Sequence, residues 1–246
     1  MIELQNISFS AETESGETKE ILKDINLKID ERFVAITGPN GSGKSTLARI
    51  IAGINTPTGG KILLDGEDIT NMSITERAQR GISFAFQQPV RFKGITVKDL
   101  ICIASGKKLT VSQVCAYLSE VGLCAKDYVN REVNASLSGG EIKRIEIATM
   151  LARSTKLTLF DEPEAGIDIW SFGNLIQVFQ KMHEKTQGNI MIISHQQRIL
   201  DIADRVIVLA DGVITADGAR DDVLPALEKS RPTVCAVLTD KAEGKE

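Results

Sequence analysis

The chain has 246 residues, enough to bury a large hydrophobic core, and we treat residues 1–246 as one domain. Its 29 basic and 33 acidic residues give a net charge of −4, so it lacks the positive field that would make nucleic acid a main partner. The four cysteines form no C-x-x-C pair, the first residues resemble no secretion leader, and no apolar run reaches the roughly 20 residues that cross a bilayer. We therefore expect a cytoplasmic protein with reduced thiols, in which any membrane role needs a separate subunit.

Short apolar runs alternate with helical patterns along the chain, which indicates an α/β fold. Continuous apolar runs of about five residues are typical of strands buried on both faces of a parallel sheet. Four such runs occupy residues 33–37, 82–86, 157–160 and 190–194.

An antiparallel flank is predicted beside this core. The pairs Asp65-Gly66 and Asp211-Gly212 each lie between apolar runs, as hairpin turns do. The polar residues 11–20 are expected to form a loop.

A glycine-rich segment follows the first core strand. Residues 38–46 read GPNGSGKST, which fits the G-x-x-x-x-G-K-[ST] phosphate-loop pattern between a buried strand and a helical run. Backbone N–H groups and the helix N-terminus would hold phosphates, the Lys44 ammonium would reach the β- and γ-phosphates, and the Ser45 hydroxyl would bind Mg²⁺. A glycine-rich turn without a ligand is the alternative. The predicted ATP-binding residues here are Gly38, Pro39, Asn40, Gly41, Ser42, Gly43, Lys44, Ser45 and Thr46.

Helical spacing replaces the strand signals between residues 88 and 146, which predicts a helical insertion within the nucleotide-binding core. Its end contains residues 137–141, LSGGE, at the start of the helical run IKRIEIATMLA. By itself an S-G-G segment is a common turn.

Two adjacent carboxylates, Asp161 and Glu162, end the third core strand. Side chains alternate in direction at a strand end, so the two can serve different tasks. Asp161 is predicted to hold the magnesium hydration shell, and Glu162 to polarise the water that attacks the γ-phosphate. The alternative is the solvated start of a loop, which we disfavour because the phosphate loop is present.

The order of these motifs resembles that of ATP-binding-cassette (ABC) proteins, and the resemblance covers nearly the whole chain. Residues 137–141 are similar to the LSGGE signature of that family, and we call them the signature segment. The resemblance implies an ABC-type nucleotide-binding domain with a RecA-like core, which hydrolyses Mg-ATP. It also implies a transient ATP-dependent homodimer, in which Ser138, Gly139 and Gly140 bind the ATP of the other subunit at a helix N-terminus.

Three further residues take their expected roles from the resemblance alone. Gln87 matches the family's Q-loop glutamine, which contacts Mg²⁺, with Gln88 as the alternative one residue along. Asp168 matches the D-loop aspartate, and His195 matches the switch histidine that touches the γ-phosphate. A lone histidine at a strand end is otherwise an ordinary core or rim residue.

The chain departs from the family pattern in two places. Many members stack adenine on an aromatic residue near position 11, where this chain has Ala11, with Phe9 as the nearest ring. Glu31-Arg32 replaces the usual Gly-Glu before the first core strand.

Three stretches resemble the SufC branch of the family, the ATPases of iron–sulfur cluster assembly. They are FAFQQPVRFKGI, SGGEIKRIEI and HQQRIL. The resemblance implies a SufB-like (or SufB/SufD-like) scaffold partner that docks near residues 89–95. The EPEAGIDIWSF segment departs from the branch pattern, which suggests a divergent or minimal system. The alternatives are the ATP-binding subunit of a membrane transporter and a nucleotide-gated interaction module with incidental hydrolysis.

Overall fold

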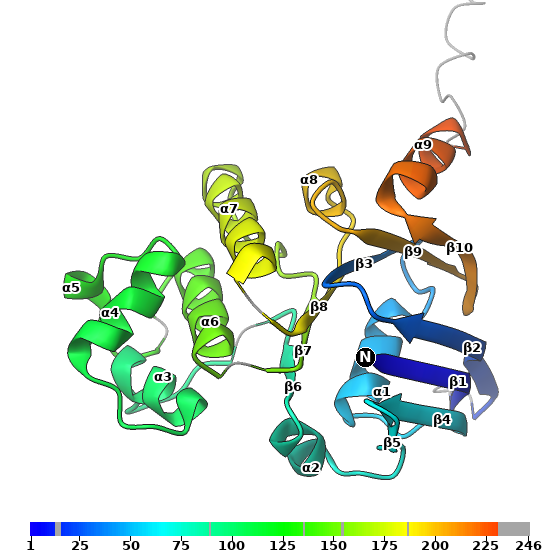
Figure 1. Ribbon diagram of the computed structural model, residues 1–246, viewed down its shortest axis with the longest axis horizontal. Coiled ribbons are helices and arrows are strands. Elements are labelled where there is room, and N and C mark those ends of the chain that lie inside the picture. The colour runs from blue at the N-terminus through cyan, green and yellow to red at the C-terminus, as the bar shows by residue number, and fades with distance from the viewer. Residues whose placement is uncertain (13–15, 89, 135, 154, 186, 231–246) are drawn as a thin grey trace, which may run out of the picture.

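The computed structural model describes residues 1–12, 16–88, 90–134, 136–153, 155–185 and 187–230. The strands are β1 (Ile2–Glu12), β2 (Thr18–Ile29), β3 (Phe33–Thr37), β4 (Gly59–Leu64), β5 (Glu67–Asp68), β6 (Ile82–Ala85), β7 (Leu157–Asp161), β8 (Asn189–Ile193), β9 (Arg205–Ala210) and β10 (Val213–Ala219). The helices are α1 (Lys44–Ala52), α2 (Ile74–Gln79), α3 (Val97–Ser105), α4 (Val111–Glu120), α5 (Ala125–Tyr128), α6 (Gly139–Arg153), α7 (Ile169–Lys185), α8 (Gln197–Leu200) and α9 (Arg220–Ser230). Helices α3 to α6 gather at one end of the molecule, and β1, β2 and β4 lie side by side at the other (Figure 1).

A six-stranded sheet in the order β10-β9-β3-β8-β7-β6 forms the centre of the molecule. All neighbouring pairs from β9 to β6 are parallel, and β10 is antiparallel to β9. The four predicted core strands are thereby confirmed as β3, β6, β7 and β8.

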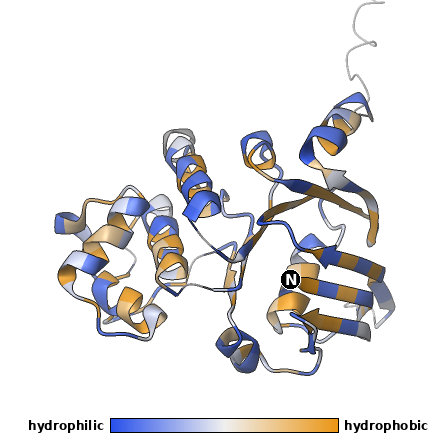
Figure 2. Cartoon of the chain, in the orientation of Figure 1, coloured by the Kyte–Doolittle hydropathy of each residue, from blue (hydrophilic) through white to orange (hydrophobic). Residues whose placement is uncertain are grey.

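Both faces of this sheet are buried, which explains why its strands are continuous apolar runs. In β3, Phe33 and Ala35 face the hydrophobic cluster under α6 and α7, whereas Val34 and Ile36 face the cluster around α1. All four side chains are fully buried. Figure 2 shows the same concentration of hydrophobic residues along the strands.

A second, antiparallel sheet has the order β2-β1-β4-β5 and covers α1. The Asp65-Gly66 turn joins β4 to β5, and the Asp211-Gly212 turn joins β9 to β10. Both residues of each turn have positive φ, at 52° and 84° in the first and 50° and 81° in the second. That combination is the type I′ hairpin geometry, so both predicted hairpins are confirmed.

The loop predicted at residues 11–20 is wrong at both of its ends. Strand β1 continues to Glu12 and β2 begins at Thr18, with Ala11 opposite Lys19 and Glu12 opposite Thr18. A backbone ladder needs no apolar side chains, so a polar hairpin arm that leaves the core reads as a loop in the sequence.

Helices are found in the predicted insertion between residues 88 and 146, but the last of them crosses its predicted end. Helix α6 continues to Arg153. Its later residues Ala148 and Ala152 belong to the same hydrophobic cluster as Phe179 of α7, so α6 packs on the core as well as on α3 and α4.

A buried arginine fixes the end of α1. Arg77 is 1% exposed, and its guanidinium donates to the carbonyls of Ile50 at 2.6 Å and Ile51 at 2.9 Å in the last turn of α1. A cation at this end also complements the helix dipole. The helix that follows the phosphate loop is therefore held from its C-terminus.

The unusual Glu31-Arg32 pair ties β3 to its surroundings. The Glu31 carboxylate binds the Arg205 guanidinium of β9 at 3.0 and 3.1 Å, and Arg205 also binds Asp217 at 2.6 Å. The Arg32 guanidinium donates to the His183 carbonyl near the end of α7. These bonds supply the physical account of the substitution.

Candidate functional site

The phosphate loop packs directly on the central sheet. Gly38 has φ 137°, and a Cβ atom there would lie 1.9 Å from the carbonyl oxygen of Leu209 in β9. Gly41 has φ 77° and open space around it, so its glycine is needed for the backbone conformation alone. Both positions require glycine, for different reasons.

The side chain of Lys44 folds back over the residues that precede it in the phosphate loop. Its ammonium donates to the carbonyls of Gly38 at 2.9 Å and Pro39 at 2.8 Å, and the residue is only 5% exposed. Burial lowers the Lys44 pKa, while the nearby Glu162 and Asp161 carboxylates partly oppose that shift. The ammonium therefore faces the cavity side of the site beside two acids.

The start of α1 offers hydrogen-bond donors to a ligand. Its N-cap, Gly43, is in the left-handed conformation and provides no side-chain cap, so the first N–H groups of the helix need another acceptor. The Ser42 hydroxyl is also buried, and no described residue hydrogen-bonds to it. Phosphate oxygens would satisfy both, which means that the loop fits a phosphate group.

Oxygen ligands lie beside the loop at the end of β7. The Ser45 hydroxyl donates to Asp161 Oδ1 at 2.8 Å, and Asp161 is 2% exposed. Burial raises the Asp161 pKa, and the Ser45 hydrogen bond and Arg49 oppose that shift. A hydroxyl and a carboxylate fit Mg²⁺, which takes few protein ligands and completes its shell with phosphates and water. Among the described residues, no three His, Cys, Asp or Glu side chains gather in a group that could hold a metal ion by themselves.

Glu162 lies where three predicted site residues meet. Its Oε2 accepts a hydrogen bond from Gln87 Nε2 at 2.7 Å, and its Oε1 lies 3.6 Å from His195 Nε2. Glu162 has φ 44°, a left-handed conformation that costs a non-glycine residue about 1–3 kcal/mol. Burial lowers the His195 pKa, as does Lys44, and Glu162 opposes them.

A cavity of about 660 Å³ is lined by Gln87 and Glu162, but not by His195, together with parts of the chain that the sequence did not indicate. The phosphate loop, Gln87 and Glu162 line one side of it. The other side is lined by Lys19, Glu20, Ile21 and Lys23 of β2 and by the Asp211-Gly212 turn. Lys23 N–H donates to the Gly212 carbonyl at 2.9 Å, which joins these two segments. No local pattern distinguishes such lining residues from an ordinary hairpin.

The signature segment lies outside this cavity. None of its described residues lines it; Gly139 instead lines a second cavity of about 590 Å³ with Gln88 and Gly166, and Gln87 lines both cavities. Ser138 and Glu141 cap the start of α6 reciprocally, with Ser138 N–H to Glu141 Oε2 at 2.6 Å and Glu141 N–H to Ser138 Oγ at 3.3 Å. The Tyr128 hydroxyl and the Ser138 N–H hold the Glu141 pKa at about 2.

Asp168 also lies apart from the phosphate-loop cavity. It is exposed, and its carbonyl accepts the Phe172 N–H at 3.0 Å as α7 begins. A single chain therefore brings Lys44, Ser45, Gln87 and Glu162 to one cavity but leaves out the signature segment and Asp168.

Glu164 lies beside the end of β8, next to His195, and it was not identified from the sequence. The Ser194 hydroxyl donates to its carboxylate. Burial raises the Glu164 pKa, and the Ser194 hydrogen bond and the nearby His195 N–H oppose the shift. The pair belongs to two strand ends that are distant in sequence, so no spacing rule could have found it.

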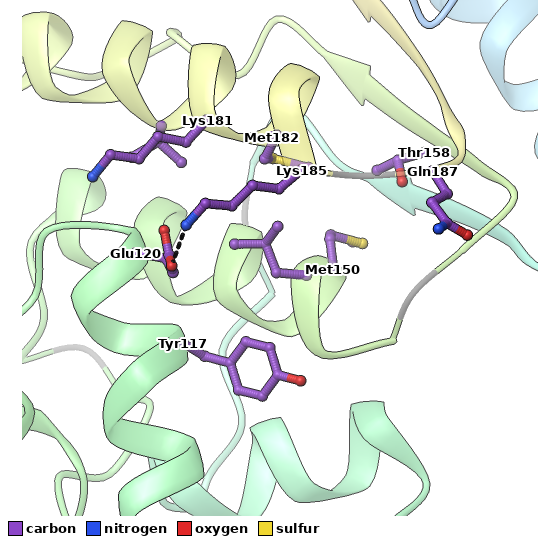
Figure 3. Close-up of a pocket in the computed structure, with 10 residues that line it drawn as sticks. Tyr117, Glu120, Met150, Thr158, Lys181, Met182, Lys185 and Gln187 are labelled. Carbon is purple, nitrogen blue, oxygen red and sulfur yellow. Dashed lines mark hydrogen bonds and ion pairs between the residues drawn. The ribbon is translucent and has the colours of Figure 1, made fainter.

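A further cavity of about 480 Å³ lies between α4, α6 and α7 (Figure 3). Its lining includes Tyr117, Met150 and Met182, and the ion pair between Lys185 and Glu120, at 2.5 Å, crosses it. None of the predicted site residues lines it, so it is separate from the nucleotide chemistry.

Comparisons with known proteins agree with this geometry. The family model described as ABC transporter matches residues 22–165. The uncharacterized ABC transporter ATP-binding protein MJ0035 of Methanocaldococcus jannaschii is 39% identical over 214 residues, covering 83% of this chain and 85% of that protein. The probable ATP-dependent transporter ycf16 of Antithamnion sp. is 36% identical over 232 residues, covering 87% and 90%.

Two other matches bear on the type of protein. The sulfate/thiosulfate import ATP-binding protein CysA of Pseudomonas aeruginosa is 32% identical over 230 residues, covering 90% of this chain and 68% of that protein. The dimeric structure of a post-hydrolysis state of the ATP-binding cassette MJ0796, bound to ADP and Pi, has a TM-score of 0.79 at 26% identity and covers 89% of this chain and 99% of that chain. The fold is thus that of an ATP-binding cassette.

Proposed function

We propose that this chain, which belongs to the ABC transporter family of ATPases, forms its complete catalytic site only when two copies of it meet. The family establishes an ATPase that uses ATP with Mg²⁺, and the two-copy site with its residue roles is our proposal. One observation carries it. No described residue of the signature segment lines the cavity of the phosphate loop, although the phosphate loop and the signature segment both resemble phosphate-binding motifs.

The residues of one chain would prepare the γ-phosphate for attack by water. The phosphate-loop N–H groups and Lys44 bind and orient the phosphates. Glu162 accepts a proton from the water as its oxygen bonds to the γ-phosphorus, and the bond to the β–γ bridging oxygen breaks to release ADP. Mg²⁺, when held through Ser45, Asp161 and Gln87, neutralises phosphate charge.

The second chain would complete the electrostatics. Its Ser138, Gly139 and Gly140 lie at the N-terminus of α6, where hydroxyl and N–H groups and the helix dipole favour an anion. His195 of the first chain would contact the same γ-phosphate, and Asp168 would lie at the contact between the chains. The dimeric structural neighbour supports an arrangement of this kind.

For the biological partner, the proposal is a SufB-like (or SufB/SufD-like) scaffold of iron–sulfur cluster assembly. The support is the resemblance of three stretches of the sequence to that branch, and an apolar patch beside Gln87. Phe86, Val90 and Phe92 are 39%, 48% and 36% exposed, and they line a small cavity next to α3 and α6. Residue 89, at the edge of the predicted docking segment, lies outside the described residues.

The charge around this patch indicates the kind of segment that would dock. Arg91 and Lys93 are exposed beside the three apolar side chains. A helix of the scaffold that combines apolar and acidic residues would complement both features. ATP-driven closure of the dimer would then move the scaffold through the patch.

The competing function is the ATP-binding subunit of a membrane transporter, which the names of the relatives favour. In the described part of the chain, no helix combines the length and apolarity of a membrane span. Affinity purification from the native host separates the two functions. Recovery of a SufB-like protein by the wild type but not by Phe86→Asp/Phe92→Asp supports the scaffold proposal, with Ile103→Asp, on the exposed face of α3, as the control. Recovery of a multi-span membrane protein would establish the transporter role instead.

A further inference from the structure

Two charged residues of α6 are buried where the helix passes β6. Lys143 is 2% exposed, and its ammonium lies 3.0 Å from Oε2 of Glu146, whose side chain is 14% exposed. Burial raises the Glu146 pKa, and Lys143 and a backbone N–H oppose that shift. Taking two charges out of water is costly, so the pair needs a reason beyond its mutual attraction.

The pair holds the peptide segment that follows β6. The Lys143 ammonium donates to the Phe86 carbonyl and is itself paired with the Glu146 carboxylate. The last β6–β7 pair is Ala85 with Phe160, so Phe86 lies just beyond the ladder and its polar groups lack a strand partner. We call Lys143 and Glu146 the Phe86 clamp.

The clamp lies between two halves of different ATP sites. On one side, α6 begins with the signature segment, and Lys143 follows Ser138 by little more than one helical turn. On the other side, Phe86 is followed directly by Gln87, whose amide binds Glu162 at 2.7 Å. A rigid helix and one peptide therefore connect the signature segment to the catalytic carboxylate of the same chain.

We propose that the Phe86 clamp couples the two ATP sites of the dimer, so that a signature segment engaged on the partner's ATP positions Gln87 and Glu162 in its own chain. This inference rests on the proposed two-copy site. Lys143 and Glu146 are positioning residues, because they act through Gln87 and touch neither substrate nor the reacting atoms.

The test separates positioning from simple structural support. Lys143→Met/Glu146→Leu replaces the buried charges by apolar side chains of similar size, which removes the clamp without leaving an unpaired buried charge. We expect its urea unfolding midpoint and its ATP-driven dimerisation to stay near those of the wild type. Its kcat should fall about tenfold, because Gln87 no longer orients Glu162. Arg153→Met, which removes another α6 cation that binds a backbone carbonyl, is the control and should keep its kcat.

Coupling itself is measured in mixed dimers. An excess of Lys44→Ala chains gives each active chain a partner that supplies a signature segment but binds no ATP. The ATPase rate of each wild-type site should then fall at least about fivefold, since the signature segment of the wild-type chain has no partner ATP to bind. The clampless variant, already slow, should not change. An excess of Lys44→Ala/Ser138→Arg chains, which lack both half-sites, should abolish activity and so demonstrate mixing.

Three outcomes decide the matter. A wild-type kcat in the clampless variant, or slowing of that variant by Lys44→Ala chains as strongly as the wild type, would overturn the clamp. No slowing of the wild type by Lys44→Ala chains would also overturn it. No inhibition of the wild type by the doubly defective chain would instead overturn the two-copy site.

Discussion

The starts of helices α1 and α6, at the phosphate loop and at the signature segment, differ in whether side chains bind their free N–H groups. Helix α1 follows the phosphate loop with no side-chain cap at Gly43 and a buried Ser42 hydroxyl that no described residue binds. Helix α6 caps itself through Ser138 and Glu141, and none of its residues lines the phosphate-loop cavity.

The difference separates a prepared half-site from a half-site that must be engaged. The α1 end has its donors, lysine and acids already at one cavity. At the start of α6, Ser138 and Glu141 bind the free N–H groups of the chain itself. When another chain presents an anion, this cap must rearrange or share these N–H groups with the anion. We therefore expect nucleotide affinity to depend mainly on α1 and its loop, and the timing of hydrolysis to depend on α6.

The largest effect is expected at Glu162. Glu162→Gln removes the proton acceptor but keeps the size of the side chain, so kcat should fall at least about a hundredfold while ATP still binds. Size-exclusion chromatography with Mg-ATP should show an accumulated dimer. Hydrolysis at the wild-type rate in this variant would remove Glu162 from the catalytic role.

A smaller effect should distinguish the two neighbouring glutamines. Gln87→Ala loses the hydrogen bond to Glu162, and we expect kcat to fall about tenfold. Gln88→Ala, its matched control, alters a residue that does not line the phosphate-loop cavity and should leave kcat unchanged. Equal effects in steady-state assays would contradict the assignment of Gln87.

The cap on α6 can be tested through stability. Glu141→Gln weakens the capping box, which should cost about 1 kcal/mol and lower Tm by about 2–4 °C. It should also change hydrolysis, because the cap lies at the signature segment. Asp99→Asn disrupts the equivalent Thr96–Asp99 capping box on α3, so thermal melting should show a similar loss while hydrolysis stays normal. A Glu141→Gln chain with unchanged hydrolysis would mean that the cap has only a structural role.

The smallest effect concerns the pH dependence of stability. Burial and Lys44 hold the folded His195 pKa below its ordinary value of about 6.5. Above pH 6.5 the ring is neutral in both states; as pH falls below 6.5 the unfolded state binds the proton first, so stability decreases until the folded pKa is passed. Urea unfolding at pH 7.5 and 5.5 should therefore show a shallower loss in His195→Gln than in the wild type. A steeper loss in the variant would reverse the sign.

Much of the fold was predictable because the physics is local. Buried parallel strands are continuous apolar runs, and the turns at Asp65-Gly66 and Asp211-Gly212 need residues that tolerate positive φ. The loop predicted at residues 11–20 was wrong at its two ends, which belong to β1 and β2, because the pairing of these polar strand ends is made by the backbone.

The parts of the site that depend on distant contacts could not be predicted in the same way. Lys143 and Glu146 look like surface charges on a helix until α6 is placed against Phe86. Glu164 reaches Ser194 only through the adjacent ends of β7 and β8. Such pairs depend on tertiary packing, which no spacing rule describes.

The central claim, that the site is shared between two copies, is tested most directly by mixing two inactive chains. Lys44→Ala disables the phosphate loop and Ser138→Arg disables the signature segment, so each chain alone should be inactive. A mixed dimer contains one intact site, from the phosphate loop of the Ser138→Arg chain and the signature segment of the Lys44→Ala chain. Half of the dimers are mixed and each has one working site, so an equimolar mixture should recover about a quarter of wild-type ATPase activity if the two sites act independently, and about a twentieth if the Phe86 clamp also slows a site whose own signature segment is disabled. A mixture as inactive as its components, in dimers shown to exchange chains, would contradict the shared site.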